Sequence, residues 1–193
     1  MTLLWRIPKE KHMDVEFKAW PKIERIKGAP IVTITEKIDG TNSCVIIQDG
    51  KLVGVQSRTR MIKPGDDNFG FAFWVYDNEE ELSRILGDGY HYGEWYGEGI
   101  QKNPHKITGR RFALFNVGRQ YPEGFDTTEL PVKTVPHLYT GPWYETVVEN
   151  HMNAVRFVAE DEGYEPEGII VYWHQTRSYS KATFRSPEGK WAA

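Results

Sequence analysis

The chain has 193 residues, of which 39% are hydrophobic and 13% aromatic, and its formal net charge is -3. This composition suits one packed domain, and it excludes both an intrinsically disordered chain and a uniformly basic surface for nucleic acid. The single cysteine, Cys44, excludes an intrachain disulfide framework, and the sequence shows neither a signal peptide nor an apolar run that could span a membrane. We therefore expect a soluble, cytoplasmic protein.

The first predicted elements are a β-branched run at residues 31–35 and a β-hairpin. The hairpin consists of two β-rich segments, 43–48 and 51–57, which flank the two-residue turn Asp49-Gly50. This turn predicts three cross-strand pairs: Gln48 with Lys51, Ile46 with Val53, and Cys44 with Val55. The same register places Arg58 opposite Thr41 and puts Cys44 in the core.

The rest of the chain is predicted to mix strands and helices. Apolar spacing predicts one helix over residues 67–86, with Phe69, Phe73 and Tyr76 in the core rather than on a stacking platform. A second amphipathic helix is expected at 143–162 and a long irregular loop at 120–142. The further strands expected are 90–96, 111–117, 169–173 and 179–185. Because strands and helices do not alternate regularly, we expect an α+β fold with mainly antiparallel sheets.

Positive charge is concentrated in two segments, although the chain as a whole is slightly acidic. These candidate nucleic-acid contacts are Arg6, Lys9, Lys11 and His12 near the start, and Lys102, His105, Lys106, Arg110 and Arg111 in the middle. A solvated basic loop is the alternative interpretation of both segments.

The most informative segment is Lys37-Ile38-Asp39-Gly40-Thr41-Asn42. Its lysine follows the apolar run and stands directly before a tight turn, so we expect it to lie at the end of a strand. A lysine in that position can act as a nucleophile if it is kept deprotonated. Free lysine titrates near pH 10.4, so such chemistry needs positive charge nearby. On its own, the motif could equally be a solvated lysine before a turn.

The pattern Lys-x-Asp-Gly-x-Asn resembles the adenylate-accepting motif of the covalent nucleotidyltransferases, which include ATP-dependent DNA and RNA ligases and capping guanylyltransferases. Further segments match the family's motifs in order: Ser57-Arg58-Thr59-Arg60, Tyr92-Gly93-Glu94-Trp95-Tyr96-Gly97, Arg111-Phe112-Ala113-Leu114-Phe115-Asn116-Val117, Glu167-Gly168-Ile169-Ile170-Val171-Tyr172 and Ser180-Lys181-Ala182-Thr183-Phe184. The ordered matches cover most of the chain, which argues against chance agreement. The resemblance implies an ATP-grasp-like adenylyltransferase domain over residues 1–193, with helices flanking the sheets and no C-terminal oligonucleotide-binding domain.

The resemblance also implies which residues take part in catalysis. Lys37 would be the nucleophile that accepts AMP, Lys181 would contact the α-phosphate, and Arg58 would donate to the sugar and phosphate region. Asp39 and Glu167 are the expected ligands of Mg²⁺ (or Mn²⁺), acting partly through water.

The expected nucleotide contacts come from the same motifs: Glu36, Asn42, Glu94, Phe115, Lys181 and Arg58. Glu94 would accept a hydrogen bond from the ribose, Phe115 would stack on adenine, and Glu36 could accept from the adenine amino group. Taken singly, Glu94 could be an exposed strand residue and Phe115 a core aromatic. Asn42 also has a purely conformational interpretation as a turn residue.

One position departs from the family's fifth motif. Many ligases carry Lys-x-Lys there, and this chain has Tyr179 at the first position and Lys181 at the second. The missing cation could be supplied by Arg177, Lys190 or the metal. We expect this departure to affect adenylate transfer to the nucleic acid more than the first step.

The sequence of the lysine motif, Glu-Lys-Ile-Asp-Gly-Thr-Asn, with Trp20-Pro21-Lys22-Ile23 upstream, most resembles that of small phage-type RNA ligases that seal nicked duplex RNA. This implies an ATP-dependent polynucleotide ligase that joins 5′-phosphate and 3′-hydroxyl ends through a lysyl-AMP intermediate, with RNA favoured over DNA. It would act in the cytoplasm of a phage host, and a partner protein could supply a strand clamp. The alternatives are a minimal DNA ligase core, or a nucleotide-binding end sensor without full ligation activity.

Overall fold

The computed structural model describes residues 17–22 and 28–184. Its strands are β1 (Ile31–Lys37), β2 (Thr41–Gln48), β3 (Lys51–Ser57), β4 (Met61–Ile62), β5 (Gly89–Gly97), β6 (Arg110–Leu114), β7 (Val132–Thr134), β8 (His137–Pro142), β9 (Gly168–Trp173) and β10 (Ser178–Thr183). Its helices are α1 (Phe71–Asp77), α2 (Glu79–Leu86) and α3 (Val147–Glu162). None of these helices is long and apolar enough to cross a membrane, a finding limited to the residues described.

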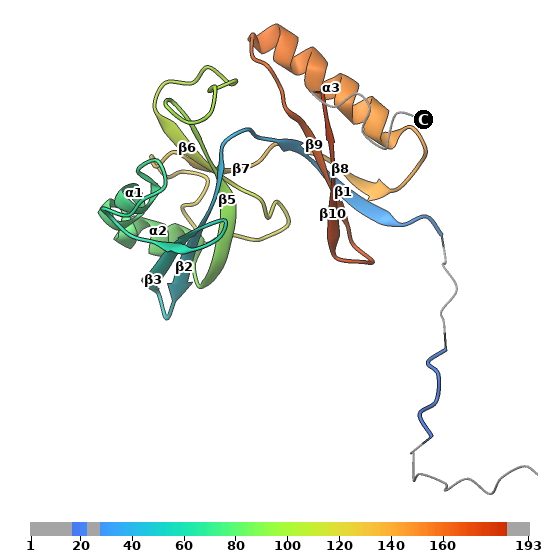
Figure 1. Cartoon of the computed structure of the whole chain (residues 1–193), viewed down its shortest axis with the longest axis horizontal. Coiled ribbons are helices and arrows are strands. Elements are labelled where there is room, and N and C mark those ends of the chain that lie inside the picture. The colour runs from blue at the N-terminus through green and yellow to red at the C-terminus, as the bar shows by residue number, and fades with distance from the viewer. Residues whose placement is uncertain (1–16, 23–27, 185–193) are drawn as a thin grey trace, which may run out of the picture.

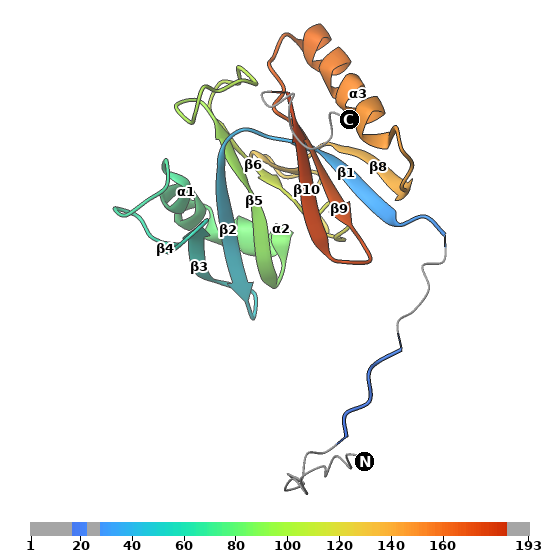
Figure 2. The same ribbon diagram turned by 45° about the vertical axis from the view of Figure 1, so that its right-hand side comes forward.

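The strands form two sheets that lie side by side (Figures 1 and 2). One sheet has four strands in the order β10-β9-β1-β8, and the other has six in the order β4-β3-β2-β5-β6-β7. The pairs in both sheets are antiparallel except β6 with β7. The expected α+β fold with mainly antiparallel sheets is therefore confirmed.

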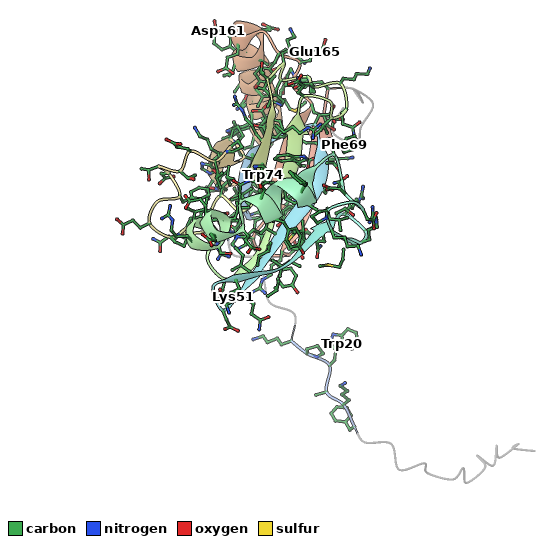
Figure 3. All side chains as sticks on the ribbon, turned by 90° about the vertical axis from the view of Figure 1, so that its left-hand side faces the viewer. Trp20, Lys51, Phe69, Trp74, Asp161 and Glu165 are labelled. Carbon is green, nitrogen blue, oxygen red and sulfur yellow. The ribbon has the colours of Figure 1, made fainter. Side chains whose placement is uncertain are left out.

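Each sheet has its own hydrophobic core. The six-stranded sheet packs against α1 and α2, where the Phe71 ring lies 4.9 Å from Phe112 and 5.3 Å from Trp95 between centroids. Figure 3 shows Trp74 on α1 at this face, and its ring stacks on Trp95 at 4.9 Å. The four-stranded sheet packs against α3, with Ile34 fully buried. Each such side chain stabilises the fold by roughly 1.5–3 kcal/mol.

The single helix predicted over residues 67–86 is wrong in its start and continuity. The Asp67 carboxylate accepts hydrogen bonds from the backbone N–H groups of Ala72 and Phe73, and α1 begins only at Phe71. The helix is then interrupted at Asn78, and α2 begins at Glu79. The short helix α1 buries the face of Phe71, Ala72 and Val75. The predicted core aromatics Phe69, Phe73 and Tyr76 lie before this helix or on its other side and are 48%, 64% and 42% exposed.

The hairpin prediction is correct at the turn and wrong beyond it. Gln48 pairs with Lys51 as expected, but a β-bulge then pairs Ile46 with Gly54 instead of Val53. Val53 is the extra residue of the bulge and is 55% exposed. The shift places Arg58 directly after the Ser57–Ser43 pair, rather than opposite Thr41.

Cys44 is buried, as predicted, although its cross-strand partner is Gln56 and not Val55. Burial raises the pKa of its thiol to about 12. The thiol therefore stays protonated and unreactive at neutral pH.

The long irregular loop predicted at 120–142 is also wrong, because it contains β7 and β8. These strands lie at the edges of the two sheets, where the prolines of this segment are tolerated. Between them, Val135 donates from its N–H to the Leu114 carbonyl and packs with Ile38 and Ala113. This small third cluster joins the two sheets beside the lysine motif.

Candidate active site

Lys37 is the last residue of β1 and stands where the chain leaves the four-stranded sheet. It pairs with Gly168 of β9. After Ile38, which is 5% exposed, and the turn at Asp39-Gly40, the chain enters the six-stranded sheet as β2 (Figure 2). The predicted nucleophile therefore lies at the junction of the two sheets.

Two glycines allow the backbones around Lys37 to approach closely. A Cβ on Gly40 would lie 2.5 Å from the Trp95 carbonyl oxygen and 2.7 Å from Cβ of Tyr96. A Cβ on Gly168 would lie 2.0 Å from the Ala182 carbonyl oxygen, and its φ of +149° is one that L side chains rarely adopt. The motif glycines are thus needed for close packing on β5 and on β10.

The Lys37 side chain forms an ion pair with Glu167. Its Nζ donates to Oε2 of Glu167 at 2.5 Å, and the two side chains are 21% and 18% exposed. Glu167 directly precedes Gly168, so the strand pairing that positions the lysine also positions its partner. The pair holds the amine in place and puts a proton acceptor in contact with it.

Glu94 lies beside this pair and is fixed by Asn42 on the neighbouring strand. Nδ2 of Asn42 donates to Oε2 of Glu94 at 2.8 Å, and Glu94 is only 8% exposed. Burial raises the pKa of Glu94 to about 7, and the negative charge of Glu167 contributes to the rise. The charge of Lys37 and the hydrogen bonds from Gly40 and Asn42 oppose it. The structure therefore brings together Lys37, Asn42, Glu94 and Glu167.

Lys181 shares a sheet face with Lys37. Lys181 pairs with Ile170, which in turn pairs with Thr35, two residues before Lys37 on β1. Because side chains alternate along a strand, Thr35 and Lys37 point to the same side, and so does Lys181. Lys181 is exposed on that face.

Phe115 and Arg58 lie at the ends of strands of the other sheet. The N–H of Phe115 donates to the Tyr92 carbonyl at 2.9 Å, which extends the β5–β6 register by one pair. Alternation then puts Phe115, 39% exposed, on the same face as Glu94. Arg58 is exposed at the turn that follows β3.

Glu36 lies on the opposite face of β1 from Lys37 and is 6% exposed. Its Oε1 accepts a hydrogen bond from the Tyr164 hydroxyl at 3.0 Å and lies 4.0 Å from Nε2 of His105. The His105 ring stacks on Tyr164 at 4.5 Å. Burial raises the pKa of Glu36, and the bond from Tyr164 lowers it in part. The oxygen expected to contact adenine is thus engaged with Tyr164.

The sequence did not single out Tyr164 or Asn68 as part of this region. Asn68 bonds through its amide to the hydroxyl of Thr41 at 3.0 Å and to that of Ser43 at 3.4 Å. Both residues act on the segments beside Lys37 from distant parts of the chain. They belong to none of the matched motifs, so no sequence signal marked them.

The two expected metal ligands, Asp39 and Glu167, do not form a dense cluster. Among residues 17–22 and 28–184, no group of three or more His, Cys, Asp or Glu side chains could hold a metal. Magnesium keeps several waters and needs only one or two carboxylates. Since Glu167 raises the pKa of the nearby Glu94, a cation here would also relieve repulsion between two carboxylates. The carboxylates of Glu167 and Glu94 are therefore compatible with Mg²⁺ or Mn²⁺, whereas Asp39 acts electrostatically on His105.

The two basic segments differ in what the structure shows. Arg6, Lys9, Lys11 and His12 lie outside the described residues. In the middle segment, Lys106 donates to the Gly163 carbonyl at 2.5 Å, and Arg110 donates to the Phe69 carbonyl at 2.7 Å. Two of the five candidates in the middle segment, Lys106 and Arg110, are thus bonded to backbone carbonyls of other loops.

Comparisons with known proteins agree with this architecture. A family model described as RNA ligase matches residues 30–191. Among solved structures, a Naegleria gruberi RNA ligase mutant with ATP and Mn is 20% identical, with a TM-score of 0.55, and the match covers 86% of this chain and 52% of that one. The same ligase with PPi is 20% identical, with a TM-score of 0.53 and coverages of 86% and 53%.

A third structure, a mutant of that ligase with AMP and Mn, is 20% identical, with a TM-score of 0.54 and coverages of 82% and 51%. The chain thus spans about half the length of the solved structures it matches. No curated protein matches the chain. The solved structures establish a shared nucleotidyltransferase-type fold, and the family model covers most of the sequence. The chain therefore belongs to the RNA ligase family.

Proposed function

We propose that this domain catalyses the adenylation chemistry of an ATP-dependent RNA ligase, with Lys37 as the residue that accepts AMP. The observation that carries the proposal is the Lys37–Glu167 ion pair at the junction of the sheets, with Glu94 beside it. Membership of the RNA ligase family supports it, as do the solved relatives bound to ATP, AMP and PPi.

The first step forms a bond between Lys37 and AMP. The ammonium must first lose a proton, and Oε2 of Glu167, at 2.5 Å, is placed to accept it. The neutral amine then attacks the α-phosphorus of ATP. A phosphorus–nitrogen bond forms, the bond from the α-phosphorus to the bridging oxygen breaks, and pyrophosphate leaves with that electron pair.

Other side chains of the site would bind and orient the nucleotide. Phe115 presents an exposed ring for adenine on the same face as Glu94, which would accept from the ribose. Lys181 would place a positive charge beside the α-phosphate from the face it shares with Lys37. A divalent cation held by Glu167 and Asp39 would supply charge to neutralise the phosphates.

Two later steps would complete ligation. An oxygen of a 5′-phosphate attacks the lysine-bound AMP, which breaks the phosphorus–nitrogen bond and transfers AMP to the strand end. A 3′-hydroxyl then attacks that 5′-phosphate and displaces AMP. We propose RNA rather than DNA as the substrate because the chain belongs to the RNA ligase family. We also propose that the reaction takes place in a reducing cytoplasm, because the one cysteine is a buried free thiol.

The decisive experiment labels the protein with ATP that is radioactive at the α-phosphate. Wild type should retain label on a denaturing gel, and Lys37→Ala should not. Lys51→Ala is the matched control, because Lys51 is an exposed lysine at the hairpin turn (Figure 3) and should leave labelling unchanged. Equal labelling of wild type and Lys37→Ala would reject Lys37 as the acceptor.

A second assay tests which strands are joined. Nicked RNA and nicked DNA duplexes with a 5′-phosphate, with or without a preformed adenylate, would be compared. Sealing of RNA alone supports the proposal, whereas equal sealing of DNA supports the minimal DNA ligase core. Because Tyr179 replaces a lysine, we expect pre-adenylated ends to be sealed faster than 5′-phosphate ends. Nucleotide binding without any sealing would support the end-sensor alternative.

A further inference from the structure

The four-stranded sheet has one face packed against α3 and a second face that carries Lys37 (Figure 1). We call this second face the lysine face, and it is formed by Lys37, Thr33, Tyr172, Tyr179 and Lys181. The pairs Thr33–Tyr172 and Tyr172–Tyr179 place Thr33, Tyr172 and Tyr179 in one row across three strands, which we call the tyrosine row. Tyr179 is the residue that departs from the fifth motif, and its function is not explained by the adenylation chemistry.

Two features of the tyrosine pair are unusual for structural residues. The ring of Tyr179 is 71% exposed, although it packs against Tyr172 with 5.0 Å between centroids. The Tyr172 ring also lies 5.0 Å from the ring of His174, so three rings follow one another on this face. A large exposed aromatic row on one sheet face is suited to stacking on flat partners.

The rest of the row is polar and held in place. The hydroxyl of Thr33 is hydrogen-bonded to Nε2 of His174 at 2.9 Å and to the hydroxyl of Thr140 at 2.9 Å. This network fixes His174 against Tyr172 and supports the ring orientation. The row is therefore prepared before a ligand arrives, which lowers the entropy cost of binding.

The charge of the lysine face differs from that of the whole chain. Among the four strands of this sheet, the one carboxylate is Glu36, and it lies on the α3 side. The lysine face itself carries Lys37, which is paired with Glu167, and the exposed Lys181. Aromatic rings beside the charge of Lys181, with no carboxylate from these four strands on the same face, match the chemistry of a nucleic-acid strand.

The distance to Lys37 also fits. Lys37 pairs with Gly168, which pairs with Thr183, and these three residues form a second row, the lysine row. Tyr179 precedes Thr183 by four residues on β10. At about 3.3 Å per residue, the tyrosine row lies about 13 Å from the lysine row, a length that a few nucleotides span. A strand whose end reaches Lys37 could therefore lay a base on Tyr179.

We propose that Tyr179, supported by Tyr172, stacks on a base of the nucleic-acid strand whose end is delivered to Lys37. The inference rests on the proposed function for the identity of that end. A four-stranded sheet whose exposed aromatics stack on bases is an established design for RNA binding. In this chain, Tyr179 would stack on a base, whereas the lysine that many ligases carry at this position would supply a positive charge.

The test is the affinity for a short fluorescein-labelled single-stranded RNA, measured by fluorescence anisotropy without ATP. All variants carry Lys37→Ala, so the result does not depend on adenylation and separates this proposal from the proposed function. Tyr179→Ala should weaken binding on the order of ten-fold, the loss of one base–aromatic stack. Tyr179→Phe should bind like the parent. Phe157→Ala, at a 75% exposed ring on α3, is the matched control and should also bind like the parent.

A second RNA distinguishes stacking from other contacts. With abasic sites in place of the bases, the parent and Tyr179→Ala should bind equally. Tyr179→Leu keeps an apolar side chain without a ring, and it should lose affinity as Tyr179→Ala does while melting like the parent. Parental affinity of Tyr179→Ala would overturn the proposal, and so would a defect that persists with abasic RNA.

Discussion

Asn42 and Glu94 face each other across β2 and β5, and the Asn42 amide donates to the Glu94 carboxylate at 2.8 Å. This bond joins a residue shortly after Lys37 to the buried carboxylate beside Lys37. Its geometry makes the ionisation of Glu94 sensitive to both Asn42 and the charge of Lys37.

The first prediction concerns the pH dependence of stability. The Glu94 carboxyl titrates near 4.5 in the unfolded chain and at about 7 when folded, so the folded state binds its proton more tightly. Its contribution to stability is therefore fully present below pH 4.5 and is lost as the pH rises through about 7. Glu94→Gln cannot ionise. Between about pH 5.5 and pH 8, the unfolding free energy of wild type should fall by roughly 2 kcal/mol relative to this variant.

Urea unfolding at the two pH values measures this difference. Asn42→Ala serves as a companion variant, because losing the donor should raise the pKa of Glu94 further and move the pH dependence upward. Parallel pH profiles of wild type and Glu94→Gln would show that Glu94 is ionised in both states across this range.

The second prediction concerns the metal. Glu167→Gln removes one expected carboxylate ligand and the ion pair with Lys37. We expect the Mg²⁺ concentration for half-maximal labelling with ATP to rise roughly ten-fold or more. Glu160→Gln, at an exposed position on α3, is the control and should titrate like wild type. An unchanged Mg²⁺ midpoint for Glu167→Gln would exclude Glu167 as a metal ligand.

The third prediction concerns the buried pair of Glu36 and Tyr164. Tyr164→Phe removes the hydroxyl that donates to Glu36 at 3.0 Å, leaving a buried carboxylate without this donor. The variant should lose about 1–3 kcal/mol of unfolding free energy, and the pKa of Glu36 should rise further. Thermal unfolding at neutral pH measures the loss. Tyr76→Phe, at an exposed tyrosine, should be neutral, and an equal loss in both variants would show that the Glu36 contact is not the cause.

The fourth prediction compares two glycines with positive φ. Gly168→Ala puts a methyl group 2.0 Å from the Ala182 carbonyl oxygen, so β9 and β10 must separate. A loss on the order of 4 kcal/mol or failure to fold is expected. Gly163→Ala has open space and φ of +74°, so it should cost only about 1–2 kcal/mol. Similar melting temperatures for the two variants would contradict the close approach at Gly168.

The sequence predicted well those features that depend on short-range pattern. The Asp49-Gly50 turn, the strands around residues 90–96 and 169–173, and a helix ending at Glu162 are all found. The pairing of Lys37 with Gly168, directly after Glu167, was not predicted. No local pattern links residues so far apart in the chain.

The errors arose where packing selected a different helix face and where a single inserted residue shifted a strand register. The helix α1 begins only at Phe71 and packs through Phe71, Ala72 and Val75, which leaves Phe73 exposed. The extra residue Val53 shifted every later pair of the hairpin by one. Such shifts depend on tertiary contacts, so spacing alone did not reveal them.

The crossing from β1 to β2 has a mechanical consequence. Lys37 and Glu167 belong to the four-stranded sheet, whereas Asn42 and Glu94 belong to the six-stranded sheet. Rotating one sheet against the other would leave Lys37 and Glu167 together while moving both relative to Glu94. Ile38, inside this crossing, packs with Ala113 and Val135 and so opposes that rotation, which keeps Lys37 and Glu167 aligned with Glu94.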